Sequence, residues 1–240
     1  MPDFLDRKQL KSDARELLQN VQIPARLAAA IYLILSVGIG VASSFVEGDG
    51  VMPIFFSVLS ELVSWVLTAG FILYCMTVRR HERAEYSVLF EGFSFAGKLV
   101  WLNLIMYALI FLWSMLFVIP GIIAAYRYRF AVPNLCANPE LTAAQALDLS
   151  KKQTEGWKMQ LVLLDLSFLP WILLAAAPSI LSAVNILVPE AGLAVCGTVW
   201  FNLAAAVWSV LVAILYIPVY QCVELDYFDA ARRPFGTSDS

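Results

Sequence analysis

The sequence predicts an all-α, polytopic membrane helix bundle, and three observations carry that prediction. The chain of 240 residues is 60% hydrophobic and only 15% charged, whereas a soluble domain is nearer 45–50% apolar and about 25% charged. Apolar runs recur along it that approach the length of about 20 residues needed to cross a bilayer. All sixteen Lys and Arg residues fall where they can share one side of that membrane.

The sidedness of the charges predicts the orientation. Short loops rich in Lys and Arg stay in the cytoplasm, and the turns near residues 47–49, 120–121 and 189–190 contain no basic residue. We therefore expect these turns outside and both termini in the cytoplasm. The basic clusters are 7–26, 79–98, Arg127 with Arg129, 151–158, and Arg232 with Arg233.

The whole chain is predicted to be one domain, with a cytoplasmic segment at each end of the bundle. Residues 1–25 hold an amphipathic helix over 4–21, in which apolar residues such as Leu10 and Leu17 recur at helical spacing. This helix lies either on the inner membrane surface or against the protein as an ordinary packed helix. Residues 221–240 are expected to form a polar cytoplasmic tail.

The transmembrane bundle is predicted over residues 26–220, with about six spans. They are expected at 27–46, 52–78, 99–119, 122–137, 159–187 and 193–220. Residues 99–137 then form a hairpin with Pro120-Gly121 at its outer tip. Either both legs cross fully, which we prefer, or the hairpin enters and leaves on the inner face. Pro170 and Pro178 are expected to kink the fifth span.

A short cytoplasmic helix is expected between the hairpin and the fifth span, over residues 142–155. The string Thr142-Ala-Ala-Gln145 has the pattern of a capping box, in which two side chains satisfy the first free N–H groups of a helix. Gly156 suits the residue after a helix end, because glycine adopts the left-handed conformation used there.

Four strings of residues resemble a known family. They are Leu112-Trp-Ser-Met-Leu-Phe-Val-Ile-Pro-Gly-Ile-Ile123, Asn138-Pro-Glu-Leu141, Ala146-Leu-Asp-Leu-Ser-Lys-Lys152 and Leu166-Ser-Phe-Leu-Pro-Trp171. In order and spacing they resemble the bacterial integral-membrane family called domain of unknown function 975, over about residues 80–228. The resemblance implies a polytopic protein of the bacterial inner membrane with no settled activity. The family is also distantly similar to membrane domains fused to phosphodiesterases, which implies a lipid-side or scaffolding role. The chain departs from the family pattern at 153–156, and at Arg127 and Arg129.

A polar stripe on the second span is the main candidate site. Ser57, Glu61 and Ser64 recur on one helix face. Since a carboxylate in hydrocarbon costs about 2.5 kcal/mol or more, Glu61 is expected to face protein or water. Arg127 lies at matching depth on the return leg of the hairpin, and Arg129 is about 200° further around the helix. We therefore expect Glu61 to pair with one of them, preferably Arg127. The pair either locks two helices together or lines a solute or proton pathway; otherwise each charge reaches separately toward water.

Two further features concern packing and the inner interface. Ser36, Gly40 and Ser44 recur every four residues in the first span, which is typical of close helix contact within a bundle or between copies. Asp165 lies near the inner end of the fifth span, where we expect its carboxylate to reach headgroup water.

The sequence contains no motif for catalysis, a cofactor or a metal, so we expect a protein that is not an enzyme. His81 is the only histidine, and the four cysteines lack CxxC spacing. Two functions remain: a non-enzymatic membrane scaffold or accessory protein with a cytoplasmic interaction surface, or a small-solute or ion transporter that uses the polar face around Glu61. The expected partners are the phospholipid bilayer and a membrane protein or second copy. Nucleic acid is not expected, because the basic residues are scattered among acidic ones.

Overall fold

The computed structural model describes residues 6–19, 25–44, 51–80, 85–187 and 198–232, in which every regular element is a helix. The all-α prediction is therefore confirmed. In chain order the helices are α1 (Arg7–Gln19), α2 (Ala25–Ser44), α3 (Val51–Arg79), the 3-10 helix η1 (Tyr86–Phe95), α4 (Ala96–Leu116), α5 (Val118–Arg127), α6 (Ala131–Ala137), α7 (Ala143–Gln153), α8 (Lys158–Leu187) and α9 (Val199–Arg232).

Four helical stretches in the described residues are long and apolar enough to cross a membrane. They are α3, η1 continued by α4, α8 and α9. The predicted number of about six is wrong, and two of the expected spans account for the difference. The apolar part of α2, Arg26–Val41, is shorter than a span, and residues 122–137 do not form one helix.

The return leg of the hairpin breaks at the arginines. Helix α5 ends at Arg127 and α6 begins at Ala131. Ten residues of α5 rise only about 15 Å, which is half of the roughly 30 Å hydrocarbon core. The preferred full crossing of both legs is therefore not formed. The hairpin is tight, because an added Cβ at Gly121 would lie 2.1 Å from Ser114 Oγ.

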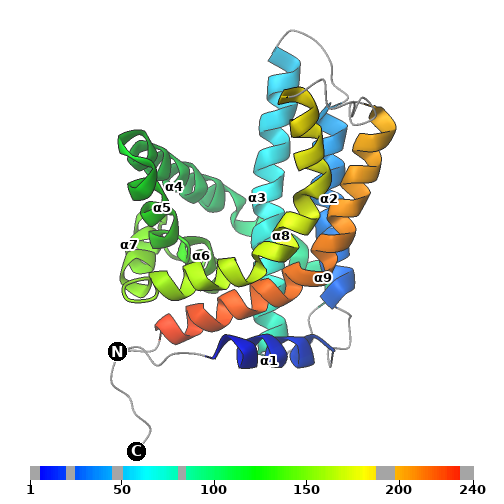
Figure 1. Ribbon diagram of the computed structural model, residues 1–240. Helices are drawn as coiled ribbons and strands as arrows, with labels where there is room; N and C mark the ends of the chain where they lie inside the picture. Colours follow the sequence, from blue (N-terminus) through cyan, green and yellow to red (C-terminus); the bar gives the residue numbers. More distant parts are fainter. Residues whose placement is uncertain (1–5, 20–24, 45–50, 81–84, 188–197, 233–240) are drawn as a thin grey trace, which may run out of the picture.

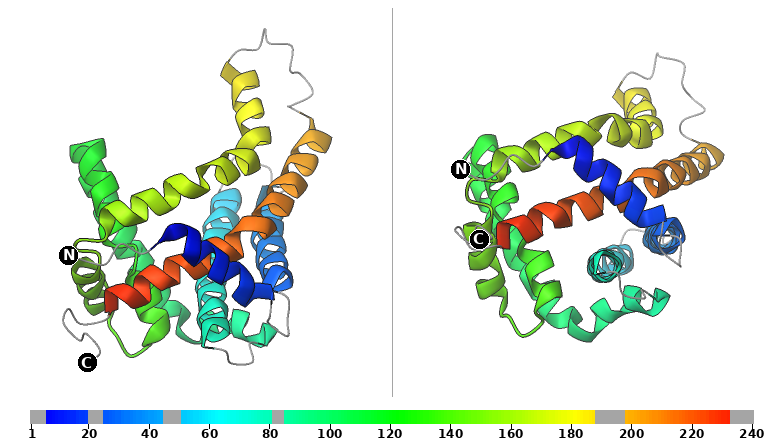
Figure 2. Two further views of the ribbon diagram at one scale, coloured as in Figure 1. Left: turned by 60° about the horizontal axis from the view of Figure 1, so that its bottom comes forward. Right: turned by 90° about the horizontal axis from the view of Figure 1, so that it is seen from below.

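The helices form two levels, which we name the upper bundle and the base. In the upper bundle α2, α3, the second half of α8 and the first half of α9 stand side by side (Figure 1). In the base α1, the first half of α8 and the second half of α9 run across the lower end of that bundle, and α6 and α7 lie beside them, beneath the hairpin of α4 and α5. Seen from below, α1 crosses α8 and α9, while α2 and α3 are viewed nearly end-on (Figure 2). Both termini of the described chain thus lie at the base, together with the lower end of α3.

Helices α8 and α9 bend where they pass from one level to the other (Figure 1). Prolines lie inside both: Pro170 and Pro178 in α8, and Pro218 in α9. Proline lacks the N–H that would bond the carbonyl four residues earlier, and its ring pushes the helix apart there. The bend in α8 agrees with the predicted proline kinks.

Side chains from neighbouring helices bond to carbonyls close to these prolines. Pro178 leaves the Leu174 carbonyl without its helical donor, and the indole Nε1 of Trp208 on α9 donates to it at 2.9 Å. One residue on, the Ser209 hydroxyl donates to the Ala175 carbonyl, also at 2.9 Å. The kink in α8 is thereby tied to α9 by two hydrogen bonds within an apolar setting.

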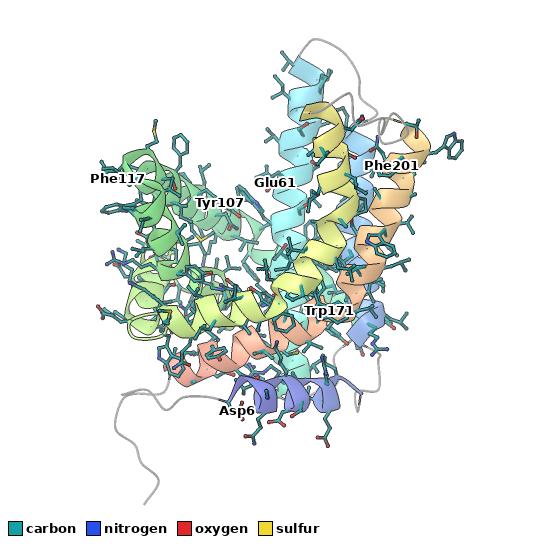
Figure 3. The ribbon with its side chains drawn as sticks, viewed as in Figure 1. Asp6, Glu61, Tyr107, Phe117, Trp171 and Phe201 are labelled. Atoms are coloured by element: carbon teal, nitrogen blue, oxygen red, sulfur yellow. The ribbon has the colours of Figure 1, made fainter. Side chains whose placement is uncertain are left out.

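Helix α1 packs against the protein, which favours the second of its two predicted settings. Ala14 is buried, and Leu10 and Leu17 pack against the main core. The Lys11 ammonium lies 4.0 Å from the centre of the Phe168 ring. The opposite face of α1 points away from the molecule, as Figure 3 shows for the region of Asp6.

The predicted start of the short helix α7 is confirmed, as is the turn that follows it. Thr142 and Gln145 form both hydrogen bonds of a capping box. Gly156 has φ 85°, in the left-handed region that glycine adopts without strain.

The expected tail boundary at residue 221 falls inside α9, which continues to Arg232. Val223, Leu225, Tyr227 and Phe228 are at most 1% exposed. This segment is therefore part of the core of the base, and only residues 233–240 of the predicted tail lie outside the described residues. Its acidic residues find partners there, Glu224 in Arg129 and both Asp226 and Asp229 in Arg79.

Candidate functional site

A buried arginine joins four segments at the centre of the base. Arg129 lies in the turn between α5 and α6, and its side chain is only 15% exposed. Its Nη1 and Nη2 atoms donate to the two Asp165 carboxylate oxygens at 2.6 and 2.8 Å, and its Nε donates to Glu224 Oε1 at 2.6 Å. The hydroxyls of Tyr126 and Tyr220 each donate to Asp165 at 2.7 Å, and Tyr220 also contacts Arg129. We call these five residues the Arg129 network.

The electrostatics of the network favour a permanently charged arginine. Burial alone would lower the pKa of Arg129, but the Glu224 and Asp165 carboxylates outweigh it and raise that pKa. Burial, with the hydrogen bond to Asp165, raises the pKa of Tyr126 to about 12. Its phenol therefore stays protonated as a donor at neutral pH. The network has two carboxylates for one guanidinium, but the carboxylates accept from Arg129 and from the two phenols. It therefore fits a structural lock better than a proton carrier.

A second ion cluster ties α3 to the same part of α9. Arg79, in the last turn of α3, lies 2.5 Å from Asp226 and 2.8 Å from Asp229. Glu224, which meets Arg129, is less than two helical turns away on α9. The end of α9 is therefore the hub on which α3, the turn after α5, and α8 converge through charge pairs.

The turn that presents Arg129 is held from below by α7. The Ser150 hydroxyl donates to the Arg127 carbonyl at 2.9 Å and accepts from the Phe130 N–H at 3.1 Å. The Thr154 hydroxyl donates to the same carbonyl at 3.2 Å. Breaking a helix leaves backbone groups without partners, and buried backbone groups must be bonded. Helix α7 supplies those partners, so it fixes the position from which Arg129 reaches Asp165.

The predicted pair between Glu61 and Arg127 is not formed. Glu61 is exposed on α3, and its carboxylate accepts from Trp65 Nε1 at 2.8 Å. Trp65 stacks on Tyr107 of α4, with ring centres 5.4 Å apart; Figure 3 shows Glu61 and Tyr107 on these two helices. Arg127 is exposed at the end of α5. The depth argument assumed one continuous return span, and the break in that leg places Arg127 in the base instead.

On this face of α3 the hydroxyl groups of Ser57 and Thr68 bond to carbonyls of their own helix. The Ser57 hydroxyl donates to the Pro53 carbonyl at 2.8 Å, and the Ser64 carbonyl accepts from the Thr68 hydroxyl at 2.8 Å. Thr68 also lies 3.2 Å from the Tyr32 hydroxyl of α2. Thr68, four residues beyond Ser64, thus connects α3 to α2.

The small residues of α2 differ in their surroundings in the described part of the chain. A Cβ added at Gly40 would meet nothing within 4 Å. The Ser36 hydroxyl oxygen is buried with no hydrogen-bond partner, and the side chain of Ser44 lies outside the described residues. Close contact at Gly40 within one copy is therefore not seen, and contact between copies stays a prediction.

The partners of Arg129 were missed by the sequence reasoning. Asp165 was expected to reach headgroup water, and Glu224 was assigned to a solvated tail. Each lies in an apolar stretch near the inner end of a predicted span, and Arg129 is a third such charge. A single charge in an apolar segment requires a partner. The presence of three such charges could therefore have predicted that they pair with one another.

The described ranges contain no candidate metal site, because no three His, Cys, Asp or Glu side chains in them are placed to hold an ion. Cys75, Cys136 and Cys222 are buried free thiols. Burial raises the pKa of Cys136 to about 12, which makes its reactive thiolate rare at neutral pH. His81 and Cys196 lie outside the described residues.

The comparisons with known proteins agree with the motif strings. The family model described as "Protein of unknown function (DUF975)" matches residues 1–132 and 115–230. The chain belongs to this family. No curated protein and no solved structure matches the DUF975 chain.

The structure gives two of the DUF975 strings a physical role. Gly121 of Ile-Pro-Gly lets α5 approach α4, and Ser150 of Ser-Lys-Lys holds the turn that presents Arg129. Thr154, in the stretch expected to depart from the family pattern, bonds to the carbonyl of Arg127, the other expected departure. Gln153 bonds reciprocally with Asn134 of α6, at 2.7 and 3.0 Å.

Proposed function

We propose that this DUF975 protein is a non-enzymatic scaffold or accessory protein of the bacterial inner membrane, with both termini cytoplasmic and the base as its interaction surface. The observation that carries the proposal is the position of the packed core. In α3 every buried residue lies between Val66 and Val78, toward the base, whereas Val51 and Met52 at the other end are 81% and 67% exposed. A rigid, water-facing platform on a lipid-facing anchor is what a scaffold requires.

The Arg129 network supports a platform rather than a reaction centre. Its carboxylates are bound to one guanidinium and two phenols. A general base must reach a proton of its substrate, and here Asp165 is already occupied by three donor groups. The network is best suited to fixing the relative positions of α5, α6, α8 and α9.

The outer face of α7 is a suitable contact surface. Asp148, Leu149 and Lys152 are exposed on it, and the Asp148 carboxylate accepts from Lys151 at 2.8 Å. A mixture of apolar and charged side chains is typical of non-obligate protein interfaces. Helix α7 is also fixed to the core through Ser150, so a partner bound there would be held rigidly relative to the membrane.

The alternative function, a small-solute or ion transporter using the face around Glu61, has one observation in its favour. An open groove of about 400 Å³ lies between the upper halves of α8 and α9, lined by three serines, three alanines and an asparagine. Asn202 and Ser209 are the polar residues that α9 contributes. Glu61 does not line this groove, so the polar features of the upper bundle lie apart.

Site-specific photo-crosslinking in living cells tests the scaffold proposal. A benzophenone amino acid is placed at Asp148 on α7 and at Glu16 on α1, both exposed in the base. Matched positions outside the base are Phe111 on α4 and Leu211 in the upper bundle, which are 65% and 57% exposed. We expect a discrete protein adduct from a base position, weakened by Lys152→Glu, and only lipid adducts from the matched positions.

Two outcomes would reject the proposal. One is protein adducts confined to Phe111 or Leu211. The other is solute or ion flux through proteoliposomes that Glu61→Gln abolishes, which would establish the transporter. Cysteine labelling with a membrane-impermeant reagent at Glu85→Cys and Asp148→Cys checks the orientation, since both positions are expected to be protected in intact cells.

A further inference from the structure

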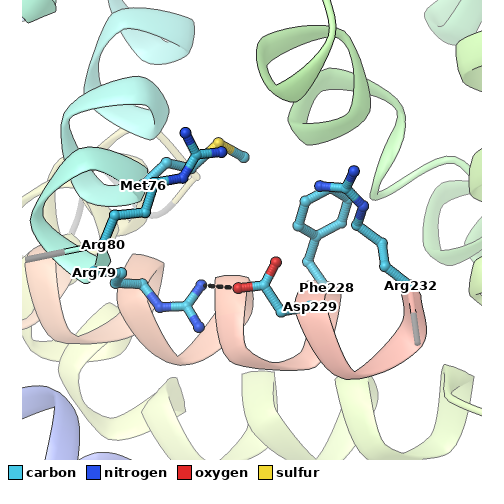
Figure 4. A pocket seen from close by; sticks show the side chains of 6 residues that line it. All are labelled: Met76, Arg79, Arg80, Phe228, Asp229 and Arg232. Atoms are coloured by element: carbon cyan, nitrogen blue, oxygen red, sulfur yellow. Dashed lines mark ion pairs between the residues drawn. The ribbon is translucent and has the colours of Figure 1, made fainter. Parts of the chain in front are cut away.

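A small cationic pocket lies where α3 and α9 end. It is lined by Met76, Arg79, Arg80, Phe228, Asp229 and Arg232 (Figure 4). Its volume is about 90 Å³, roughly that of three water molecules. The pocket therefore has room for a compact group of a few heavy atoms, such as a tetrahedral oxyanion.

The charges of the lining are unevenly matched. Arg79 is used by Asp226 and Asp229, at 2.5 and 2.8 Å; the second pair is the dashed line of Figure 4. Arg80 and Arg232 are exposed and form no ion pair with a carboxylate in the described part of the chain. The single lining carboxylate, Asp229, thus has a cation already, and two guanidinium groups remain for an external anion.

The two available arginines border the pocket from opposite helices. Arg80 follows the last turn of α3, and Arg232 ends α9. The Arg232 guanidinium lies 5.2 Å from the centre of the Phe228 ring, which limits its freedom. Guanidinium groups present paired donors that match the oxygens of a phosphate. Two of them, held on separate helices around one small space, suit a phosphate group better than a carboxylate.

The position of the pocket relative to the bilayer indicates lipid headgroups as one source of that phosphate group. Arg79 and Arg80 stand at the end of α3, a helix of membrane-spanning length, on the same level as the base. At the end of a span, side chains meet the headgroups, and the cytoplasmic leaflet of a membrane is rich in anionic lipids. Met76 and Phe228 give the pocket an apolar wall, which suits the boundary between headgroup and acyl chain.

We propose that this pocket binds a phosphate group through Arg80 and Arg232, carried either by an anionic phospholipid or by a free phosphorylated solute. Arg79 is a positioning residue, because its two aspartates hold the ends of α3 and α9 together. Both helices end here, and their C-terminal dipoles also favour cations. A purely structural role for the arginines therefore predicts no saturable anion binding, which is the distinction to be tested.

The test uses the full-length protein in nanodiscs of phosphatidylcholine. Binding of dioctanoyl phosphatidylglycerol and of inorganic phosphate is followed by native mass spectrometry and by thermal stabilisation. The variant is Arg80→Gln with Arg232→Gln, and the matched control is Arg127→Gln with Lys152→Gln, which removes the same charge from other exposed positions. We expect saturable binding by the wild type and the control, and binding about tenfold or more weaker in the variant.

Competition between the two probes identifies the molecule that carries the phosphate group. Lipid binding that millimolar phosphate does not displace identifies a headgroup, whereas displacement with equal affinity identifies a free phosphate. Equal binding by wild type and variant, an equal loss in the control, or no saturable binding of either probe would overturn the proposal. Arg80→Lys with Arg232→Lys keeps the charge and loses the paired donors, so its affinity should fall between wild type and the glutamine variant even if the latter folds poorly. None of these outcomes depends on a protein partner of α7.

Discussion

Helix α9 passes through both levels of the molecule, and the side chains that it exposes and buries differ between them. In the upper bundle it exposes large apolar side chains, with Trp200 81% and Leu211 57% exposed. In the base it buries Tyr227 and Phe228 and pairs Glu224 with Arg129. Lipid solvates apolar side chains and cannot solvate charges, whereas water does the reverse. The same helix therefore has the exposed apolar surface of a candidate membrane span above its bend and is a buried core element below it.

The largest expected effect lies in the base. Arg129→Gln leaves Glu224 and the half-buried Asp165 without their cation, so we expect a loss of about 3–5 kcal/mol in the free energy of unfolding. Thermal unfolding in mild detergent, followed by intrinsic tryptophan fluorescence, measures it. Glu61→Gln in the upper bundle is the matched control. A larger loss at Glu61 than at Arg129 would reverse the comparison between the two levels.

A close backbone contact gives the second expected effect. A Cβ added at Gly70 of α3 would lie 1.8 Å from the Leu89 carbonyl oxygen of η1. Gly70→Ala should therefore cost about 1–3 kcal/mol through overpacking. Gly40→Ala in α2 is the matched change in the upper bundle, where nothing lies within 4 Å. There the better helix propensity of alanine should leave stability equal or raise it by up to about 1 kcal/mol.

The Gly40 change also tests contact between copies. If Gly40→Ala destabilises the protein and shifts its oligomeric state in detergent, then the Ser36, Gly40 and Ser44 pattern marks an interface between copies. Unchanged oligomeric state with unchanged stability would show that this face meets lipid.

The sequence predicted the helices better than their arrangement, and the reason is physical. Hydropathy and capping residues act locally, so α3, α7 and α8 were found close to their observed limits. The conformation of the return leg depends on the ion pairs of Arg129 with Asp165 and Glu224, which are 36 and 95 residues away in the sequence. Single charges of this kind lower the mean hydropathy of a segment only slightly, so hydropathy alone still predicts a span. In the folded protein these charges meet beyond the end of α5 at Arg127, where the first half of α8 and the second half of α9 form part of the base.

The bend in α8 offers a prediction of intermediate size. Trp208→Phe removes the indole donor from the Leu174 carbonyl, which Pro178 has deprived of its helical partner. We expect a loss of about 0.5–1.5 kcal/mol in the free energy of unfolding. In a Pro178→Ala background the helical N–H returns, so the same tryptophan change should cost less. Equal costs in both backgrounds would show that the indole bond does not compensate for the proline.

The smallest expected effect concerns Glu61 and Arg127, the two charges that the sequence predicted to form a pair. Glu61 bonds to Trp65 on its own helix, and Arg127 is exposed in the base. Glu61→Gln and Arg127→Gln should therefore change stability additively, with an interaction energy within about 0.5 kcal/mol of zero. A full cycle of both single variants and the double variant, measured by thermal unfolding in detergent, gives that energy. A coupling of 2 kcal/mol or more, on the order expected for a desolvated charge pair, would mean that α5 reaches α3 in the membrane. The hairpin would then close against the upper bundle, and the separation between the two levels would be smaller than the structure shows.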